Sequence, residues 1–237
     1  PQAMLVVDGS GSMAGRVSDS RKINIVKTAI EDFGYLWPET VNVGLVVYGH
    51  RRKKDCSDIE VVATPEDGFS MSHVAKRLQK VRPVGNTPLT AAIEAAAKAL
   101  PANGKQNSII LVSDGKENCE RNPCEAARLL KEKNADLTAY VVGLGLKETE
   151  ERAQLQCVAR ETGGLYWDAT RAEDVATALD EIDKVIDDGG PDTSYLEVSA
   201  LAYACRGEEV VLQAGAYSFA DEAKPILEPF VGSEDPK

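Results

Sequence analysis

The chain has 237 residues, 43% of them hydrophobic, which suits one large domain or one domain with an appendage. Its formal net charge is −11, from 27 basic and 38 acidic residues, and this acidic balance argues against nucleic acid as a general partner. No apolar run approaches the roughly 20 residues that a membrane-spanning helix needs. The sequence starts at Pro1, almost inside the first expected strand, so we expect a processed or trimmed fragment that has lost any leader or anchor.

Hydrophobic runs and helical patterns alternate as far as residue 187. Residues 4–7 are apolar throughout, as in a strand that is covered on both faces. Residues 59–63 have more polar neighbours and suit a strand at the edge of a sheet. The other expected strands are 41–48, 108–112, 137–142 and 165–167, and the expected helices are 23–30, 70–81, 88–100, 123–134, 148–162 and 172–187. This alternation predicts an α/β fold with a doubly wound, mostly parallel sheet.

The chain changes character after residue 187. The sequence Asp187-Asp188-Gly189-Gly190-Pro191 predicts a linker, so we expect a first domain at residues 1–188 and a linker with a β-rich segment at residues 189–237. Residues 195–203 and 210–219 look like two strands joined around Arg206-Gly207-Glu208. Because a lone two-stranded hairpin is marginal in water, this segment either packs on the main domain or begins a further β-rich domain.

Three separate stretches carry the hydroxyl and carboxylate side chains Asp8, Ser10, Ser12, Thr87 and Asp114. Asp8 and Asp114 follow expected buried strands, and ligand sites in such sheets lie beyond the carboxyl ends of the strands. We expect Gly9 and Gly11 to let the chain turn sharply beneath an ion, with both serines facing the same way. An all-oxygen set suits Mg²⁺, Mn²⁺ or Ca²⁺ rather than zinc or copper. Because the set leaves the metal short of a full shell, it indicates a binding site.

Each stretch also has an ordinary interpretation. Asp and Ser favour turns and helix N-caps on their own. Thr87 followed by Pro88 is typical of a helix start, and we expect Thr87 to cap the helix at 88–100. The combination, in this order and with each stretch beside a suitable element, is what predicts a metal site.

The five residues resemble the metal-ion-dependent adhesion site (MIDAS) of the von Willebrand factor A (vWA) domain. That motif is Asp-x-Ser-x-Ser, then a distant Thr and a distant Asp, and the chain fills all of these positions in order. The resemblance covers about residues 3–187 and includes residues 162–166, which are similar to the segment before the family's last strand. Gly9 departs from the family, where Ala or another small residue is more usual. The resemblance implies a Rossmann-like sheet with an antiparallel edge strand and helices on both faces.

The resemblance also implies how the site works. Ser10 and Ser12 are expected to bind the cation directly, most readily Mg²⁺, with Mn²⁺ and Ca²⁺ as alternatives. Thr87 and Asp114 are expected to exchange between direct and water-mediated contact, while Asp8 acts through water and hydrogen bonds to the serines. A Glu or Asp carboxylate of a partner protein would take the open position. In related domains this exchange is coupled to movement of the last helix, here at residues 172–187.

A basic run at residues 50–54 is a local exception in this acidic chain. Such a run is commonly a solvated turn. The loop follows a strand expected to lie parallel to the first one, however, so it would reach the metal-bearing edge and steer an acidic partner. The residues expected to form this partner-binding rim are His50, Arg51, Arg52, Asn86 and Glu117.

The chain contains five cysteines, at positions 56, 119, 124, 157 and 205. An odd number fits reduced cytosolic thiols. Three of them, however, lie in loops expected at one end of the sheet and favour a disulfide, either between Cys119 and Cys124 or between Cys56 and one of these. Cys157 is expected to be a buried thiol, and zinc binding lacks paired Cys-x-x-Cys spacing. We therefore expect an extracytoplasmic protein, periplasmic or secreted, with a cytoplasmic location as the alternative.

The function that these features predict is metal-dependent protein binding, in adhesion or assembly. One alternative is an assembly subunit of a metal-chelatase or channel-associated complex. Another is a metal-dependent hydrolase that uses Asp8 as nucleophile or base. Phosphatases with such an aspartate usually carry a second one two residues on, where this chain has Ser10. The two histidines, His50 and His73, lie in no catalytic motif, so we do not expect an enzyme.

Overall fold

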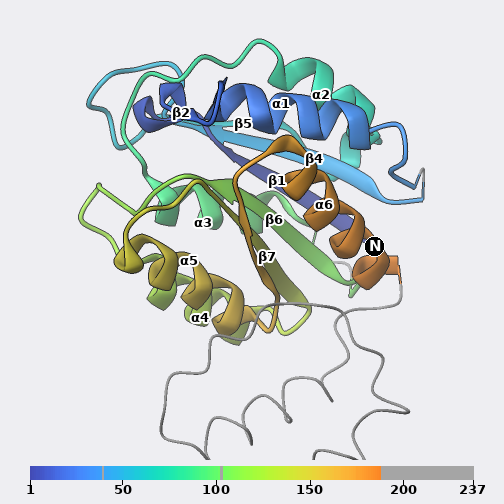
Figure 1. Cartoon of the computed structure of the whole chain (residues 1–237). Coiled ribbons are helices and arrows are strands. Elements are labelled where there is room, and N and C mark those ends of the chain that lie inside the picture. The colour runs from blue at the N-terminus through green and yellow to red at the C-terminus, as the bar shows by residue number, and fades with distance from the viewer. Residues whose placement is uncertain (39, 102–103, 188–237) are drawn as a thin grey trace, which may run out of the picture. The chain divides into compact units, whose positions relative to one another are not determined.

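The computed structural model describes residues 1–38, 40–101 and 104–187. Their core is a six-stranded sheet in the order β5-β4-β1-β6-β7-β8 (Figure 1). The strands are β1 (Gln2–Asp8), β4 (Asn42–Tyr48), β5 (Ile59–Ala63), β6 (Asn107–Ser113), β7 (Leu137–Leu144) and β8 (Tyr166–Ala169). All neighbouring strands are parallel except β5, which runs antiparallel to β4. The predicted fold class, including the antiparallel edge strand, is confirmed.

Two layers of helices cover the sheet because alternate residues of the central strands point to opposite faces. Leu5 and Val7 of β1 pack with α1, α2 and α6, whereas Met4 and Val6 pack with α3, α4 and α5 (Figure 1). Burial on both faces explains why β1 and β6 read as continuous apolar runs. The helices are α1 (Lys22–Phe33), α2 (Met71–Leu78), α3 (Leu89–Ala99), α4 (Pro123–Lys133), α5 (Thr149–Thr162) and α6 (Ala172–Asp187).

The strand order reverses at β1 and β6. From β1 the chain crosses to β4 on one side, and it later returns to place β6 on the other side. The ends of β1 and β6 therefore mark the switch point at which ligands bind in doubly wound sheets. Asp8 is the last residue of β1, and Asp114 directly follows β6.

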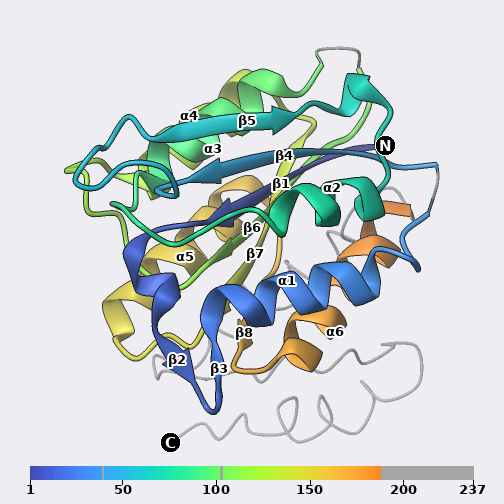
Figure 2. The same ribbon diagram turned by 90° about the horizontal axis from the view of Figure 1, so that it is seen from above.

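Two local elements differ from the sequence-based expectation. A short antiparallel hairpin of β2 (Arg16–Val17) and β3 (Ser20–Arg21) precedes α1 (Figure 2). Its residues are mostly polar and exposed, so no hydrophobic alternation announced it. At α3, the expected Thr87 cap is wrong: the N-cap position is Pro88, which provides no side-chain bond.

The last helix is tied to the edge of the sheet by an aromatic residue. Trp167 of β8 donates a hydrogen bond from Nε1 to Glu181 Oε2 of α6, at 2.7 Å. The predicted linker after residue 187, the strands expected at 195–203 and 210–219, and Cys205 lie outside the described residues. Within residues 1–38, 40–101 and 104–187, no helix is both long and apolar enough to cross a membrane.

Candidate metal centre

Parallel pairing brings the two key carboxylates together. β1 pairs with β6 over its length, with Val7 opposite Val112, so the residues that follow these strands meet at one edge of the sheet. After Asp8 the chain enters a 3-10 turn, Gly11–Ala14, that carries Ser12. Gly11 N–H donates to Gly85 O at 2.9 Å, and this bond joins the serine loop to the segment that carries Thr87.

Four of the five predicted site residues form one hydrogen-bonded chain. Asp8 Oδ1 accepts from Ser10 N at 2.7 Å. The hydroxyl oxygens of Ser10 and Ser12 lie 2.8 Å apart. Ser12 Oγ in turn donates to Asp114 Oδ1 at 2.6 Å. The serine hydroxyls and one oxygen of Asp114 are thus already neighbours.

Thr87 is placed by its backbone. Its N–H donates to Asn118 Oδ1 at 2.8 Å, while Asn118 N–H donates to Thr87 O at 3.3 Å. Asn118 belongs to the loop that follows Asp114. The position of Thr87 is therefore coupled to the loop of the second carboxylate, a link that the sequence did not reveal.

The site combines buried charge with one exposed hydroxyl. Asp8, Ser10, Thr87 and Asp114 are buried, whereas Ser12 is exposed. Burial, followed by the neighbouring Asp114 carboxylate, raises the pKa of Asp8 to about 6, although hydrogen bonds from Ser10 and Ser113 oppose this. At neutral pH Asp8 therefore carries an unfavourable negative charge beside a second carboxylate.

Gly9 has a different role from the expected one. Neither Gly9 nor Gly11 has a positive φ, so the turn does not depend on the conformational freedom of glycine, and this part of the sequence interpretation is wrong. Space is the reason at position 9: a Cβ there would lie 2.6 Å from His50 Cβ and 2.8 Å from Tyr48 O. The loop after β1 therefore packs directly against the end of β4.

The donor set fits a hard divalent cation. All the donors are oxygens of carboxylates and hydroxyls, and the side chains of Ser10, Ser12 and Asp114 adjoin one another beside the solvent-exposed Ser12. Mg²⁺, Mn²⁺ and Ca²⁺ prefer such ligands. The chain also supplies a cation of its own: Lys22 Nζ lies 2.8 Å from Asp114 Oδ2. The sequence analysis did not single out Lys22, since no motif marks it.

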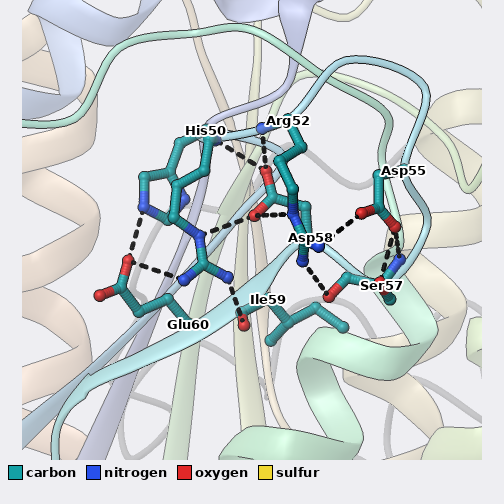
Figure 3. A network of polar contacts seen from close by, with 8 residues as sticks. His50, Arg52, Asp55, Ser57, Asp58, Ile59 and Glu60 are labelled. Carbon is teal, nitrogen blue, oxygen red and sulfur yellow. Dashed lines mark hydrogen bonds and ion pairs between the residues drawn. The ribbon is translucent and has the colours of Figure 1, made fainter.

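The basic run lies in the β4–β5 loop, where Asp55 and Asp58 of the same loop and Glu60 of β5 pair with it (Figure 3). Asp58 Oδ2 accepts from the N–H groups of Arg51 and Arg52, at 2.7 and 2.8 Å. Arg51 Nε donates to Asp58 Oδ1 at 2.8 Å. His50 Nε2 lies 2.9 Å from Glu60 Oε2, and an Arg52 guanidinium nitrogen lies 2.9 Å from Asp55 Oδ2. The loop therefore neutralises most of the charge that was expected to face a partner.

Asp58 shows how this loop is held. Its side chain is fully buried, and burial raises the pKa of an isolated carboxyl group. Here the hydrogen bonds from the Arg51 and Arg52 amides, and then the Arg51 guanidinium, outweigh burial and lower the pKa of Asp58 below its ordinary value. The sequence analysis missed this residue because a loop aspartate is normally solvated.

The other two predicted rim residues, Asn86 and Glu117, are less exposed than the basic run. Asn86 is partly buried, with its Nδ2 3.3 Å from Cys56 Sγ. Glu117 is only 9% exposed. One of its oxygens accepts from Thr90 N at the start of α3, at 2.7 Å, and the other accepts from Cys119 N at 2.8 Å. Glu117 thus provides the helix cap that was expected from Thr87.

The structure contains two disulfides among the residues that it describes. Cys56 pairs with Cys119, which is one of the expected alternatives and ties the β4–β5 loop to the loop after β6. Cys124 pairs with Cys157, so the expected Cys119–Cys124 bond does not form and the expectation of a buried Cys157 thiol is wrong. The reason is tertiary: α4 packs against α5, and helical periodicity within α5 carries no information about a partner on another helix.

Comparison with known proteins agrees with this geometry. The sequence is 30% identical over 191 residues to the uncharacterized protein YwmD of Bacillus subtilis (strain 168), covering 75% of this chain and 82% of YwmD. The fold is similar to the vWF domain of the type V pili tip protein Mfa5 from Porphyromonas gingivalis, with a TM-score of 0.60, 15% identity, and coverage of 81% of this chain and 96% of that one.

A second solved structure is proximal thread matrix protein 1 from the mussel byssus, in a form with a zinc-occupied MIDAS motif. Its TM-score is 0.60 at 17% identity, and the match covers 78% of this chain but only 45% of the byssus protein. The model of the von Willebrand factor type A domain family matches residues 4–184. The chain therefore belongs to the von Willebrand factor type A domain family.

Proposed function

We propose that this chain is a metal-dependent protein-binding module that acts in adhesion or assembly. A divalent cation, Mg²⁺ in the first place, would be held by Asp8, Ser10, Ser12, Thr87 and Asp114. When bound, it supplies a positive centre for an Asp or Glu carboxylate of a partner protein. The observation that carries the proposal is the pair of adjacent buried carboxylates, Asp8 and Asp114, beside the solvent-exposed Ser12.

Each residue has a distinct part in this proposal. Ser10 and Ser12 offer hydroxyl oxygens that are already 2.8 Å apart. Asp114 offers Oδ1, the oxygen that now accepts from Ser12. Thr87 offers a neutral hydroxyl where a further carboxylate would neutralise the centre, and this keeps the site attractive to an incoming anion.

Asp8 is better suited to orient ligands than to attack a substrate. Both of its oxygens accept hydrogen bonds, from Ser10 N and from Ser113 Oγ, each at 2.7 Å, and it has no exposed surface. The histidines are engaged elsewhere, His50 with Glu60 and His73 with Ser70. These contacts support a binding role over hydrolysis.

We also propose that the protein works outside the reducing cytoplasm. The two disulfides support this location, because such bonds persist in oxidising compartments. The printed descriptions of the similar structures, a pili tip protein and a byssus matrix protein, accord with a binding or assembly role.

Calorimetric titration with Mg²⁺ and Mn²⁺ tests the proposal. We expect one cation per chain, and we expect Asp114→Ala to weaken binding by at least about 100-fold, since even changes beyond the ligands cost about 10- to 100-fold. Asp136→Ala is the matched control: it removes the same charge from an exposed turn before β7 and should leave affinity unchanged. Equal affinities of Asp114→Ala and the unaltered chain would contradict the proposal.

A further inference from the structure

The ammonium group of Lys22 reaches the proposed metal centre from outside the motif. Lys22 is the first residue of α1, and its N–H donates to Gly15 O at 2.9 Å, which closes the β2–β3 hairpin against the helix. Its Nζ lies 2.8 Å from Asp114 Oδ2, with the lysine side chain 13% exposed and the aspartate side chain fully buried. This is a nearly buried ion pair with one member among the proposed ligands.

The path of the lysine side chain is shaped by the end of β7. Gly145 follows that strand with a φ of +59°, and a Cβ there would lie 3.3 Å from Lys22 Cε and 2.4 Å from Val17 Cγ2. A glycine is required both by the backbone conformation and by the space that the hairpin and the lysine stem occupy. The Lys22 side chain thus packs beside the β2–β3 hairpin and the end of β7 rather than extending over the surface.

The two oxygens of Asp114 are divided between different partners. Oδ1 accepts from Ser12, whereas Oδ2 accepts from Lys22. The lysine therefore sits on the oxygen that is turned away from the serines. It adds positive charge to the site while leaving Oδ1 and the serine hydroxyls available for a cation.

The net charge of the site depends on Lys22. Asp8 and Asp114 together carry two negative charges when ionised, and Lys22 cancels one of them. With a divalent cation the group would carry one net positive charge, which a single carboxylate neutralises. Without Lys22, the cation alone would neutralise the two aspartates, and an added carboxylate would bring surplus negative charge.

We propose that Lys22 makes cation binding and carboxylate binding depend on each other. It weakens binding of a divalent cation alone and strengthens capture of an acidic group once the cation is present. Lys22 acts here as a tuning residue that touches Asp114, and the inference rests on the proposed function. It identifies the partner group as one carboxylate for each loaded site.

The test compares Lys22→Met with the unaltered chain in Mn²⁺ calorimetry at pH 7.5. Each protein is titrated in sodium chloride and in sodium acetate of equal ionic strength, so that acetate serves as the carboxylate probe. In chloride, Lys22→Met should bind Mn²⁺ about tenfold more tightly, because a like charge a few ångströms away has been removed. Acetate should raise the Mn²⁺ affinity of the unaltered chain several-fold more than that of the variant.

Two further variants make the comparison specific. Lys22→Arg keeps the charge and should behave as the unaltered chain does. Lys184→Met removes an exposed lysine that pairs with Asp180 on α6, so it controls for the change in net charge. If Lys22→Met does not fold, as judged by circular dichroism, Lys22→Gln replaces it with the same expected shifts.

Each outcome has one meaning. Equal or weaker Mn²⁺ binding by the neutral variant in chloride would overturn the inference, because Lys22 would then only orient Asp114. Equal acetate enhancement in both proteins would overturn it as well. Failure of the unaltered chain to bind Mn²⁺ in either buffer would instead overturn the proposed metal site itself.

Discussion

Two fully buried aspartates at the same edge of the sheet, Asp8 and Asp58, have pKa values that are shifted in opposite directions. Burial and the Asp114 carboxylate raise the pKa of Asp8 to about 6, whereas the pKa of Asp58 is lowered despite its burial. Asp58 receives two backbone N–H groups and a guanidinium group, while Asp8 faces another carboxylate. The number of positive and donating groups around a buried acid, rather than burial alone, decides its protonation.

The two aspartates therefore mark two kinds of region: a loop whose charges are compensated within the fold, and a site whose charges are compensated only in part. His50, Arg51 and Arg52 of the β4–β5 loop are paired with Asp55 and Asp58 of the same loop and with Glu60 of β5, so these charges need no ligand. The Asp8–Asp114 pair is only partly compensated by Lys22. A site that keeps an unfavourable charge in its folded state is where a cation would contribute most.

The largest effect is expected from removing the disulfide that joins the β4–β5 loop to the loop after β6. Replacing Cys56 and Cys119 with Ser should lower the free energy of unfolding by about 4 kcal/mol, since the bond spans 63 residues. It should also weaken Mn²⁺ binding by about tenfold, because Asn118, the neighbour of Cys119, holds Thr87. Urea unfolding and calorimetry measure the two effects.

The second disulfide is the control for this prediction. Cys124 and Cys157 are separated by 33 residues and join α4 to α5, away from Thr87. Their double replacement with Ser should cost slightly less stability and leave Mn²⁺ affinity unchanged. A similar loss of affinity in both double variants would mean that general loosening, rather than the position of Thr87, is responsible.

Removing the Asp58 carboxylate from the β4–β5 loop should cost nearly as much stability as removing the Cys56–Cys119 disulfide. Asp58→Ala leaves two backbone N–H groups and the Arg51 guanidinium without their buried carboxylate, so the free energy of unfolding should fall by about 3 kcal/mol. Asp55→Ala removes a more exposed ion pair in the same loop and should cost much less stability than Asp58→Ala. Equal urea midpoints for the two variants would contradict the role given to Asp58.

Removing the charge of Asp8, by contrast, should make the metal-free protein more stable. Asp8→Asn removes a charge that is unfavourable in the metal-free fold, so the free energy of unfolding at pH 7.5 in EDTA should rise by about 2 kcal/mol. The same variant should lose Mn²⁺ binding. A less stable metal-free variant would show that the hydrogen bonds from Ser10 and Ser113 outweigh the charge.

The smallest effect is the dependence of metal-free stability on pH. Asp8 has a folded pKa of about 6 and an ordinary value of 3.8, so between these values the folded state binds the extra proton. Stability should therefore rise by about 1 kcal/mol as the pH falls from 7.5 to 5, relative to Asp8→Asn, which lacks this proton. The lowered pKa of Asp58 acts the other way, and its contribution is lost only below its ordinary value of 3.8. Parallel pH profiles for the two proteins would contradict the assignment to Asp8.

The sequence predicted the sheet because its information is local. Buried strands such as β1 and β6 are apolar at every position, and the motif residues stand at their ends. The β2–β3 hairpin was missed because it buries little, and its Ser18 adopts a positive φ that no glycine announced. Local pattern therefore gave the frame but not its polar insertions.

Within the site, the five motif residues could be named, but the roles of their supporting groups could not. Lys22 and Asp58 were not singled out, and Glu117 was expected at the partner-binding rim rather than as a helix cap. All three are charged side chains in a charged chain, and nothing in their neighbours distinguishes them from solvated residues. Their partners are Asp114, backbone amides of the β4–β5 loop and the start of α3, which are assembled only by the fold. The Cys124–Cys157 bond was missed for the same reason.

The bond between Trp167 and Glu181 has an optical consequence. The chain has two tryptophans, and the other, Trp37, is buried and donates from Nε1 to Val41 O. Sliding of α6 against β8 would break the Trp167 bond and change the polarity around that indole. In a Trp37→Phe background, the emission wavelength of Trp167 thus reports the position of α6 without any added label.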